Sequence, residues 1–173
     1  MLDELLTFSK LDAGQYQLLK QPFDLTELLT DIIEVNQVEA DARQQTISLH
    51  ATSGIQIYAD SRLLARAVEN VLRNAIKYSP AASLINISLL QQVNQLVLTI
   101  RDQGPGVSQG DIARIFEPFY RGERQPDGAV RGTGIGLSIV QEYIHAHGGR
   151  VQVLQMPGDA LRSFFRIELP DVS

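Results

Sequence analysis

The sequence predicts an α+β fold in which helices lie on one side of a mixed, mostly antiparallel sheet. Apolar residues recur at helical spacing in some segments and alternate at strand spacing in others. Two long strand segments, 84–90 and 96–101, flank the polar stretch Gln-Gln-Val-Asn, which is typical of a hairpin. The glycines do not indicate parallel βα units, because no Gly-Lys pair of a P-loop occurs and Gly132-x-Gly134-x-Gly136 lacks the Rossmann spacing.

Helical periodicity predicts helices over residues 2–13, 25–43, 61–77 and 136–147. Asp24 and Glu27 form a capping-box pattern at the start of the second helix, and Asp60 is the expected N-cap of the third. Gly14 follows the first helix and Gly148-Gly149 the last, where glycine commonly ends a helix.

Alternation predicts the remaining strands over residues 46–50, 55–58, 150–155 and 163–169, with Gly54 in the turn between the first two. From Gln103 to Gly134 the pattern is irregular and rich in Gly, Pro and Arg. A loop of this length inside a compact domain is commonly functional. We expect a lid over about residues 108–131 that is disordered or ordered only by a ligand.

Composition restricts the classes of function. The chain is 44% hydrophobic and 20% charged, which is ordinary for a globular protein. A net charge of −5 argues against a broad nucleic-acid surface, and the lack of cysteine excludes disulfides, zinc–thiolate sites and thiol catalysis. No signal peptide is evident, and no apolar run approaches the roughly 20 residues that span a bilayer. We therefore expect one domain, or one domain plus an attachment, in the cytoplasm.

The third predicted helix carries the most informative pattern. Its polar and aromatic side chains recur at i, i+4, i+7 and i+8 and therefore share one face: Asn70, Asn74, Lys77 and Tyr78. The opposite face is apolar and predicts a core contact through Leu64, Val68, Val71, Leu72 and Ala75.

This polar face has the chemistry to hold a metal ion, a phosphate and a flat base. Amide oxygens are hard, neutral ligands for Mg2+, although paired asparagines also commonly hydrogen-bond to neighbouring backbone. Lys77 offers a compact charge to phosphate oxygens, the alternative being a surface charge. Tyr78 could lie near a base or ribose, the alternative being a half-buried helix end.

Asp102-x-Gly104-x-Gly106 follows the second strand of the hairpin. A carboxylate at a strand end, beside two glycines, can approach a flat ligand closely. Asp102 could accept the exocyclic amino hydrogen of adenine, whereas guanine presents a carbonyl there, so this residue predicts ATP over GTP. The alternative is an ordinary Asp/Gly turn.

The glycine-rich stretch Arg131-Gly-Thr-Gly-Ile-Gly-Leu137 opens the last predicted helix. Glycines let backbone N–H groups approach phosphate, and a helix start favours negative charge, although the stretch could be a flexible loop with a glycine entry. The aromatic stretch Phe116 to Tyr120 is either a hydrophobic cluster or a hinge that positions a lid or contacts a partner. The three histidines are expected in structural or surface roles, and a cation would suit the helix C-terminus at His145 and His147.

Taken in order, these motifs resemble the ATP-binding catalytic domain of bacterial two-component sensor histidine kinases, which belongs to the GHKL superfamily. The four matching boxes are Asn70 to Tyr78 (N box), Asp102 to Gly106 (G1), Phe116 to Tyr120 (F) and Gly132 to Gly136 (G2). The resemblance covers about residues 21–170. It implies a two-layer α/β sandwich, the Bergerat ATP-binding fold, with about five strands, about three helices on one face, and a mobile lid.

The resemblance also implies the site. Asn74 and Asn70 would serve Mg2+, Lys77 the phosphates, and Tyr78 and Asp102 the adenosine of ATP. The other implied cofactor-binding residues lie in the two glycine motifs, with the G2 glycines on the triphosphate: Gly104, Gly106, Gly132, Thr133, Gly134, Ile135, Gly136 and Leu137. By chemistry rather than by motif, Arg121 and the neighbouring Arg124 and Arg131 are further candidates for phosphate contacts.

One part of the family pattern is missing. The family passes the γ-phosphoryl group to a histidine on a preceding helical hairpin, and no such motif occurs here. Residues 1–20 resemble only the tail of that hairpin, and residues 21–173 form the expected ATP-binding domain. The resemblance therefore implies a catalytic fragment that does not phosphorylate itself.

The resemblance also implies the surroundings of this fragment. Its partners would be its own dimerisation and phosphoacceptor domain and a response regulator, without nucleic-acid or membrane contact. The parent protein would be anchored in the inner membrane.

Two other functions are weighed against a kinase. ATP-hydrolysing relatives with this fold, of the gyrase, MutL and Hsp90 types, carry a glutamate one turn before the magnesium asparagine to activate water. That position is Asn70 here, and the adjacent Glu69 points about 100° away around the helix. The sequence therefore favours a histidine kinase over an ATPase clamp, with a non-catalytic nucleotide-binding or partner-docking module as the other alternative.

Overall fold

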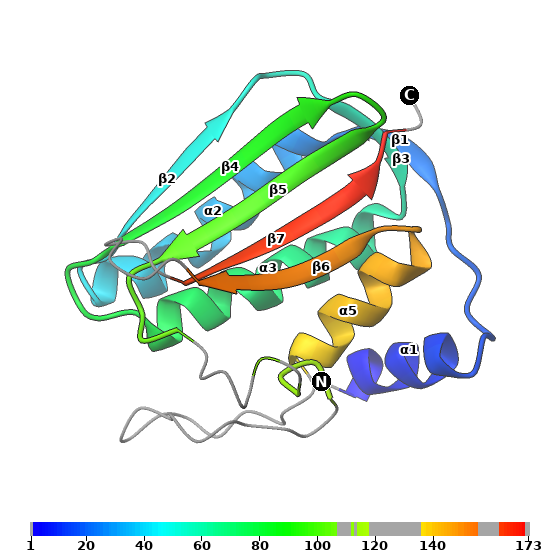
Figure 1. Ribbon diagram of the computed structural model, residues 1–173, viewed down its shortest axis with the longest axis horizontal. Helices are drawn as coiled ribbons and strands as arrows, with labels where there is room; N and C mark the ends of the chain where they lie inside the picture. Colours follow the sequence, from blue (N-terminus) through cyan, green and yellow to red (C-terminus); the bar gives the residue numbers. More distant parts are fainter. Residues whose placement is uncertain (1, 107–111, 113, 118–135, 156–162, 172–173) are drawn as a thin grey trace.

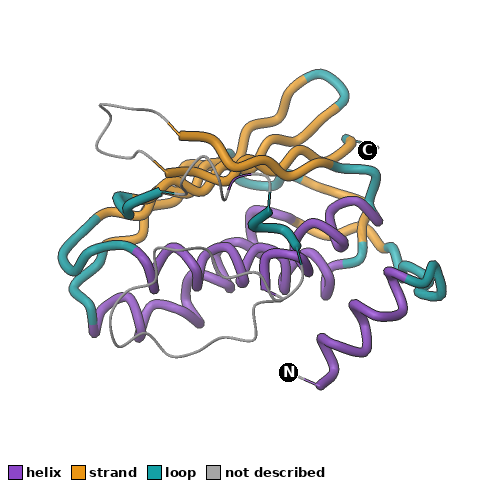
Figure 2. The backbone as a smooth tube through the Cα atoms, turned by 60° about the horizontal axis from the view of Figure 1, so that its bottom comes forward, coloured by secondary structure: helices purple, strands orange, loops and turns teal. Residues whose placement is uncertain are grey.

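The computed structural model describes residues 2–106, 112, 114–117, 136–155 and 163–171. A five-stranded sheet forms one layer, in the order β2 (Thr46–Ala51), β4 (Leu84–Gln92), β5 (Gln95–Asp102), β7 (Ser163–Pro170) and β6 (Arg150–Gln155). The second layer covers one face of this sheet and consists of α2 (Leu25–Ala42), α3 (Ser61–Tyr78) and α5 (Gly136–Ala146) (Figures 1 and 2). The predicted α+β sandwich is therefore confirmed.

The helices begin and end where the local sequence predicts. A side-chain oxygen of Asp24 accepts from the N–H of Glu27 at 3.0 Å and caps α2. Asp60 caps α3 in the same way, through the N–H of Leu63 at 3.3 Å. Gly148 follows α5 with φ of +75°, a left-handed conformation that glycine adopts without steric cost.

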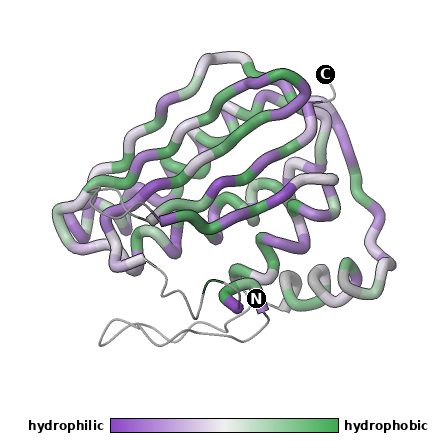
Figure 3. The backbone as a smooth tube through the Cα atoms, viewed as in Figure 1, coloured by the Kyte–Doolittle hydropathy of each residue, from purple (hydrophilic) through white to green (hydrophobic). Residues whose placement is uncertain are grey.

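The apolar face of α3 forms the centre of the core between the two layers. All of its predicted core residues are at most 2% exposed: Leu64, Val68, Val71, Leu72 and Ala75. Full burial of one Leu or Val side chain contributes about 1.5–3 kcal/mol. Burial of this face holds α3 against the sheet, so its other face is presented in a defined orientation. Figure 3 shows the hydropathy of the residues along the chain.

The sheet is mixed because only one of its neighbouring pairs is parallel. β4 and β5 form the predicted hairpin, and β7 pairs antiparallel with both β5 and β6. β2 pairs parallel with β4, with Thr46 opposite Leu84. The sheet register places Asp102, the last residue of β5, opposite Ser163 at the start of β7.

The two strands predicted on either side of Gly54 both form, but they do not pair with each other. Gly54 has φ of +77° in the turn between them. The second strand, β3 (Gln56–Ala59), pairs antiparallel with β1 (Gln21–Asp24) in a separate two-stranded sheet. The N–H of Leu25 donates to Ile55 O at 2.8 Å, which extends this pairing into the start of α2.

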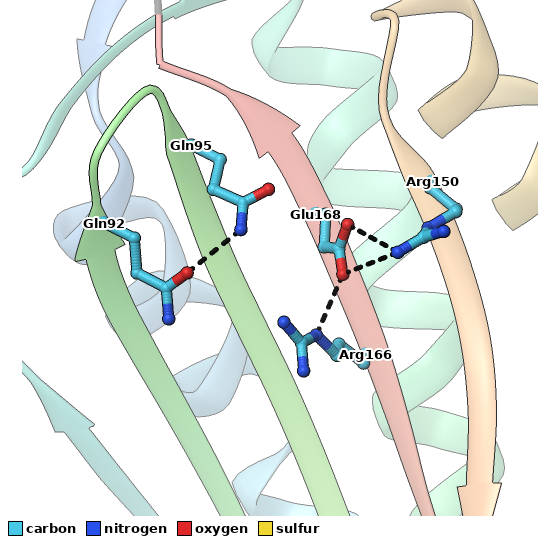
Figure 4. Close-up of polar contacts among 5 residues, drawn as sticks. All are labelled: Gln92, Gln95, Arg150, Arg166 and Glu168. Atoms are coloured by element: carbon cyan, nitrogen blue, oxygen red, sulfur yellow. Dashed lines mark hydrogen bonds and ion pairs between the residues drawn. The ribbon is translucent and has the colours of Figure 1, made fainter.

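The outer face of the main sheet carries polar side chains, as strand alternation requires. Glu168 on β7 accepts from Arg150 on β6 at 3.0 Å and forms an ion pair with Arg166 at 3.0 Å (Figure 4). Gln95 donates to Gln92 across the hairpin turn at 3.0 Å. Partly exposed ion pairs contribute at most about 1 kcal/mol each, so this face owes its order mainly to the strands beneath it.

The first helix in the sequence, α1 (Leu2–Asp12), precedes the segments that form the sandwich. Gly14, two residues after its end, has φ of +69°. It packs against α5 and is joined to β1 by residues 15–20 (Figure 1). Leu11, Tyr16 and Leu18 are partly buried against the core. Within the described part of the chain, no helix is long and apolar enough to cross a membrane.

Candidate functional site

The polar face of α3 meets the beginning of α5. Asn70, Asn74, Lys77 and Tyr78 are all half-buried along this face. The side-chain amide nitrogen of Asn70 donates a hydrogen bond to the carbonyl oxygen of Gly136, at 3.4 Å. Gly136 and Leu137 are the first residues of α5 and are also half-buried. Two sequence motifs that are 66 residues apart are thereby brought together.

The C-terminal turn of α3 places a cation beside an aromatic ring. The Lys77 ammonium lies 5.2 Å from the centroid of the Tyr78 ring. This distance is within the range of a cation–π interaction, which contributes about 0.5–1 kcal/mol at an exposed site. The interaction limits the directions in which Lys77 extends, so the charge stays at the C-terminal end of the polar face.

Asp102 is buried at the end of β5, with 6% of its surface exposed. Its Oδ1 accepts a hydrogen bond from the N–H of Gly104 at 2.7 Å. Burial raises the pKa of Asp102 to about 6, while the Gly104 N–H and the hydroxyl of Ser79 oppose the rise. The Ser79 hydroxyl is itself buried and makes no hydrogen bond of full geometry. A buried carboxyl and a buried hydroxyl therefore lie next to each other with hydrogen-bonding capacity left over.

Gly104 lies against the end of α3. A methyl group at this position would lie 2.8 Å from Asp102 Oδ1 and 3.2 Å from the carbonyl oxygen of Tyr78. These approaches are shorter than van der Waals contact, so only glycine lets the strand end and the helix end come so close. The G1 glycine thus connects Asp102 with the last turn of the helix that carries the amides.

Two side chains that sequence analysis missed hold this end of α3. The Arg43 guanidinium donates to Ser79 O at 2.9 Å and to Lys77 O at 3.3 Å. The buried amide of Gln45 donates to the carbonyls of Ile76 at 3.0 Å and Ser79 at 3.1 Å. Carbonyls at the end of a helix lack partners within the helix, so these side chains fix the last turn.

No local signal would have identified these anchors. Arg43 and Gln45 lie between α2 and β2, more than 30 residues before the carbonyls that they bind. Ser79 could have been found, because it directly follows Tyr78 and serine commonly occurs at helix ends.

Part of the predicted site falls outside the described residues. This applies to Arg121, Arg124, Arg131, Gly132, Thr133, Gly134 and Ile135, and to most of the predicted lid over residues 108–131. Gly106 is described and has φ of +76°, which favours glycine. Within the described residues, the N box therefore contacts both the G1 box, at Gly104, and the last residue of the G2 box, Gly136.

The donor set fits a magnesium nucleotide better than a transition metal. No group of three or more His, Cys, Asp or Glu residues that could hold a metal occurs among the residues that the structure describes. Asn70 donates through its amide nitrogen, which leaves the amide oxygen as the atom suited to a hard cation. The Ser79 hydroxyl beside Asp102, which makes no hydrogen bond of full geometry, suits the polar edge of a base.

Comparison with known sequences gives a family match. The sequence model of a family described as "Histidine kinase-, DNA gyrase B-, and HSP90-like ATPase" matches residues 59–173. The sensor-like histidine kinase SenX3 of Mycolicibacterium smegmatis is 29% identical over 171 residues, which are 99% of this chain and 44% of that protein. The sensor histidine kinase TmoS of Ectopseudomonas mendocina is 35% identical over 172 residues, or 98% of this chain and 17% of that protein. The chain thus spans less than half the length of these relatives.

Solved structures agree with the sequence match. The histidine kinase AdeS of Acinetobacter baumannii has a TM-score of 0.81 at 26% identity, over 99% of this chain and 77% of that chain. Full-length ShkA in complex with AMPPNP has a TM-score of 0.82 at 29% identity, over 98% of this chain and 35% of that chain. The fold, the joined motifs and these likenesses together show that the chain belongs to the histidine kinase-, DNA gyrase B- and HSP90-like ATPase family, as a catalytic domain of the sensor histidine kinase type.

Proposed function

We propose that this domain binds ATP with Mg2+ between α3 and the start of α5, and that it transfers the γ-phosphoryl group to a histidine on a dimerisation domain of the parent protein. The observation that carries the proposal is the hydrogen bond from Asn70 to Gly136, which brings the amide-bearing helix to the glycine-opened helix. The likeness to ShkA, whose structure contains AMPPNP, supports a nucleotide as the ligand.

In this proposal each element has a separate task. The amide oxygens of Asn70 and Asn74 hold Mg2+, and the ion neutralises charge on the phosphates when it is bound. Lys77 places its ammonium on phosphate oxygens. Backbone N–H groups at the start of α5, from Gly136 onward, favour negative charge because the helix dipole is positive there.

Asp102 is the proposed specificity residue. Its carboxyl accepts the exocyclic amino hydrogen of adenine, and the buried hydroxyl of Ser79 lies next to it with hydrogen-bonding capacity to spare. A guanine carbonyl at the same place would face an acceptor and would leave the buried carboxyl unpaired, which costs about 1–3 kcal/mol. The site therefore selects ATP over GTP.

The acceptor is proposed to be an imidazole rather than water. Transfer breaks the bond between the γ-phosphorus and the β–γ bridging oxygen of ATP, so that ADP leaves with this oxygen. A bond forms between the γ-phosphorus and an imidazole nitrogen, and the imidazole releases its N–H proton to solvent. A neutral imidazole nitrogen is a nucleophile near pH 7 and needs little help from a base. The chain has Asn70 where an ATPase would need a glutamate, and Asn70 is the residue that faces α5.

We propose that residues 1–20 are the end of the dimerisation and phosphoacceptor hairpin and that residues 21–173 are the ATP-binding unit. The partners would then be that hairpin domain and a response regulator. Of the histidines in this chain, His147 is buried and makes structural hydrogen bonds. None of them is the proposed acceptor.

Calorimetric titration tests the ligand. The chain should bind ATP more tightly than GTP in magnesium buffer, and Asp102→Ala should remove that preference. The matched control is Asp171→Ala. This carboxylate follows the last residue of β7, at the end of the strand away from Asp102, so its removal should leave ATP affinity unchanged. If the chain binds neither nucleotide, with or without magnesium, the kinase hypothesis is excluded and the partner-docking module remains.

Labelling tests the transfer. Incubated with γ-labelled ATP, the isolated chain should stay unlabelled, whereas a dimerisation domain supplied in trans should take up label on its histidine. Asn74→Ala should abolish that uptake. Label on the chain itself would mean that the acceptor has been misplaced.

A further inference from the structure

A carboxylate at the start of α3 also holds the segment that leads in from α1. Asp60 is 1% exposed, and its two oxygens serve two separate segments of the chain. Oδ1 accepts from the N–H of Leu63 and caps α3, at 3.3 Å. Oδ2 accepts from the N–H of Leu19 in the connection over residues 15–20, at 3.0 Å. The second bond is not needed for capping, because one oxygen is enough to satisfy an N-cap.

The backbone of the same residue is held by a histidine at the end of α5. The N–H of Asp60 donates to Nε2 of His147 at 3.0 Å. The other ring nitrogen, Nδ1, lies 2.7 Å from the carbonyl oxygen of Tyr143, so Nδ1 carries the proton and the ring is neutral. The start of α3, the end of α5 and the incoming connection therefore meet at Asp60.

A cavity of about 200 Å³ lies beside this meeting point. It is lined by Lys20, Ile57, Tyr58, Ala59, His147, Leu169 and Pro170. His147 is 8% exposed and is one of the residues that line this cavity.

We propose that the hydrogen bonds Leu19 N–H to Asp60 and Asp60 N–H to His147 form a latch that holds the segment from α1 against the catalytic domain only while His147 is neutral. We call this pair of bonds the linker latch. It joins the incoming segment to the start of α3 and the end of α5, whereas the proposed nucleotide residues lie further along α3 and at the opposite end of α5. The latch would therefore position both nucleotide-bearing helices relative to α1.

Chemistry makes the latch sensitive to protonation. A second proton on His147 would sit on Nε2 and point at the N–H of Asp60, so that donor would face donor. Among the described residues, the groups that act on the charge of the ring are the Asp60 carboxylate at the start of α3, the Lys20 ammonium in the connection and the Tyr143 carbonyl in α5. The phenol of Tyr58 on β3 lines the same cavity. Burial lowers the pKa of His147 below its ordinary value, the Tyr143 carbonyl and Asp60 oppose this, and Lys20 adds to it.

The direction of the effect follows from this shift. A histidine whose pKa is lowered in the folded protein stabilises the fold above its ordinary pKa and loses that contribution as the pH falls. The latch is thus closed at neutral pH and opens in acid. The proposal does not depend on bound nucleotide, so it can fail while the proposed kinase function stands, and the reverse is also true.

Hydrogen exchange of the Leu19 amide in the full chain is the direct measurement. Asp60→Ser keeps one oxygen for capping α3 but has none to reach Leu19. We expect the Leu19 amide to exchange at least about tenfold faster at pH 7.5, since a hydrogen bond to a charged group is lost, while the Leu63 amide stays protected. The matched control is Asp24→Ser at the N-cap of α2, which should leave Leu19 unchanged. Equal protection of Leu19 in wild type and Asp60→Ser would overturn the latch.

A second variant isolates the proton. His147→Gln offers an acceptor with similar reach but cannot titrate between pH 5 and 8. In the wild type, the ratio of Leu19 to Leu63 exchange, corrected for intrinsic rates, should rise as the pH falls from 7.5 to 5. In His147→Gln this ratio should stay constant, and in His147→Phe it should be high at every pH. A ratio that rises equally in wild type and His147→Gln would show that the histidine does not control the latch.

Discussion

The side-chain amide of Asn70 donates to the carbonyl oxygen of Gly136 at 3.4 Å, which links the middle of α3 to the first turn of α5. The same two helices are also joined at their other ends, through Asp60 and His147. The two helices that carry the proposed ATP ligands are therefore connected at two separate places. The proposed site and the linker latch thus lie on the same pair of helices.

Replacing two glycines should separate folding from binding. No described atom lies within 4 Å of a methyl group at Gly136, so Gly136→Ala should keep the melting temperature but weaken ATP binding by crowding the phosphates. At Gly149 the methyl group would lie 2.4 Å from Glu168 O, so Gly149→Ala should reduce the free energy of unfolding by about 2 kcal/mol or more. Thermal denaturation and calorimetry measure the two effects. Unchanged ATP affinity in Gly136→Ala would remove this residue from the site.

Asn74→Ala should affect binding only when magnesium is present. The affinity for ATP in magnesium buffer should fall by more than about tenfold, because even mutation of a residue that only hydrogen-bonds to a metal ligand commonly lowers metal affinity by about tenfold. In metal-free buffer the affinity should stay close to that of the wild type. Arg73→Ala, at an exposed position on the same helix, is the matched control. An equal loss in both buffers would contradict the ligand assignment.

Asp102→Asn should change how stability depends on pH. The raised pKa of about 6, against 3.8 in the unfolded chain, means that the folded protein binds the proton more tightly. Stability attributable to this carboxyl is therefore present below about pH 4 and is lost as the pH rises through 6. The asparagine keeps an oxygen for the Gly104 N–H and carries no charge, so the variant should gain up to about 3 kcal/mol over wild type at pH 8 and little at pH 4.

Denaturant unfolding at the two pH values measures this difference. The same variant should bind ATP poorly, since an amide could present a donor to the adenine amino group. A variant that is less stable than the wild type at pH 8 would show that the carboxylate is stabilised by partners rather than penalised by burial.

Gln45→Met should destabilise the end of α3 without changing side-chain volume much. Its amide donates to three carbonyl oxygens, those of Ile76, Ser79 and Pro80, and the side chain is 3% exposed. Ser79 O keeps the Arg43 guanidinium and Pro80 O keeps the Ser83 hydroxyl, so the variant removes this donor chiefly from the carbonyl of Ile76. Leaving one buried carbonyl without a donor costs about 1–3 kcal/mol, which chemical denaturation would detect. Gln92→Met, on the exposed hairpin, should cost little. Equal stability of the two variants would mean that the carbonyl of Ile76 finds another donor.

The secondary structure and the order of the site motifs could be predicted from sequence because both are local. An N-cap such as Asp24 acts on the N–H three residues later, and the apolar face of α3 repeats every three or four residues. The amide pair, the Asp-x-Gly-x-Gly turn and the glycine-opened helix are likewise short patterns. Their physical requirement is met within a few neighbouring residues, so it can be recognised before the fold is known.

Histidine chemistry shows where local reasoning was incomplete. A cation was expected to suit the helix end at His147, because the helix dipole is negative there. The structure buries this ring among Asp60, Tyr143 and the end of β7, so its pKa is lowered instead. A structural or surface role was expected for this histidine, but its partner, 87 residues away, was not predicted.

By itself, the amino-acid sequence determined which segments become helices and strands and which face of α3 enters the core, and it is the basis for the proposed magnesium-nucleotide residues. Tertiary structure alone decided that β2 joins β4 while β3 joins β1, that Arg43 and Gln45 close the end of α3, and that Asn70 reaches Gly136. The reason is physical: hydrogen bonds and burial act over a few ångströms in space, and only the folded chain decides which distant residues come that close.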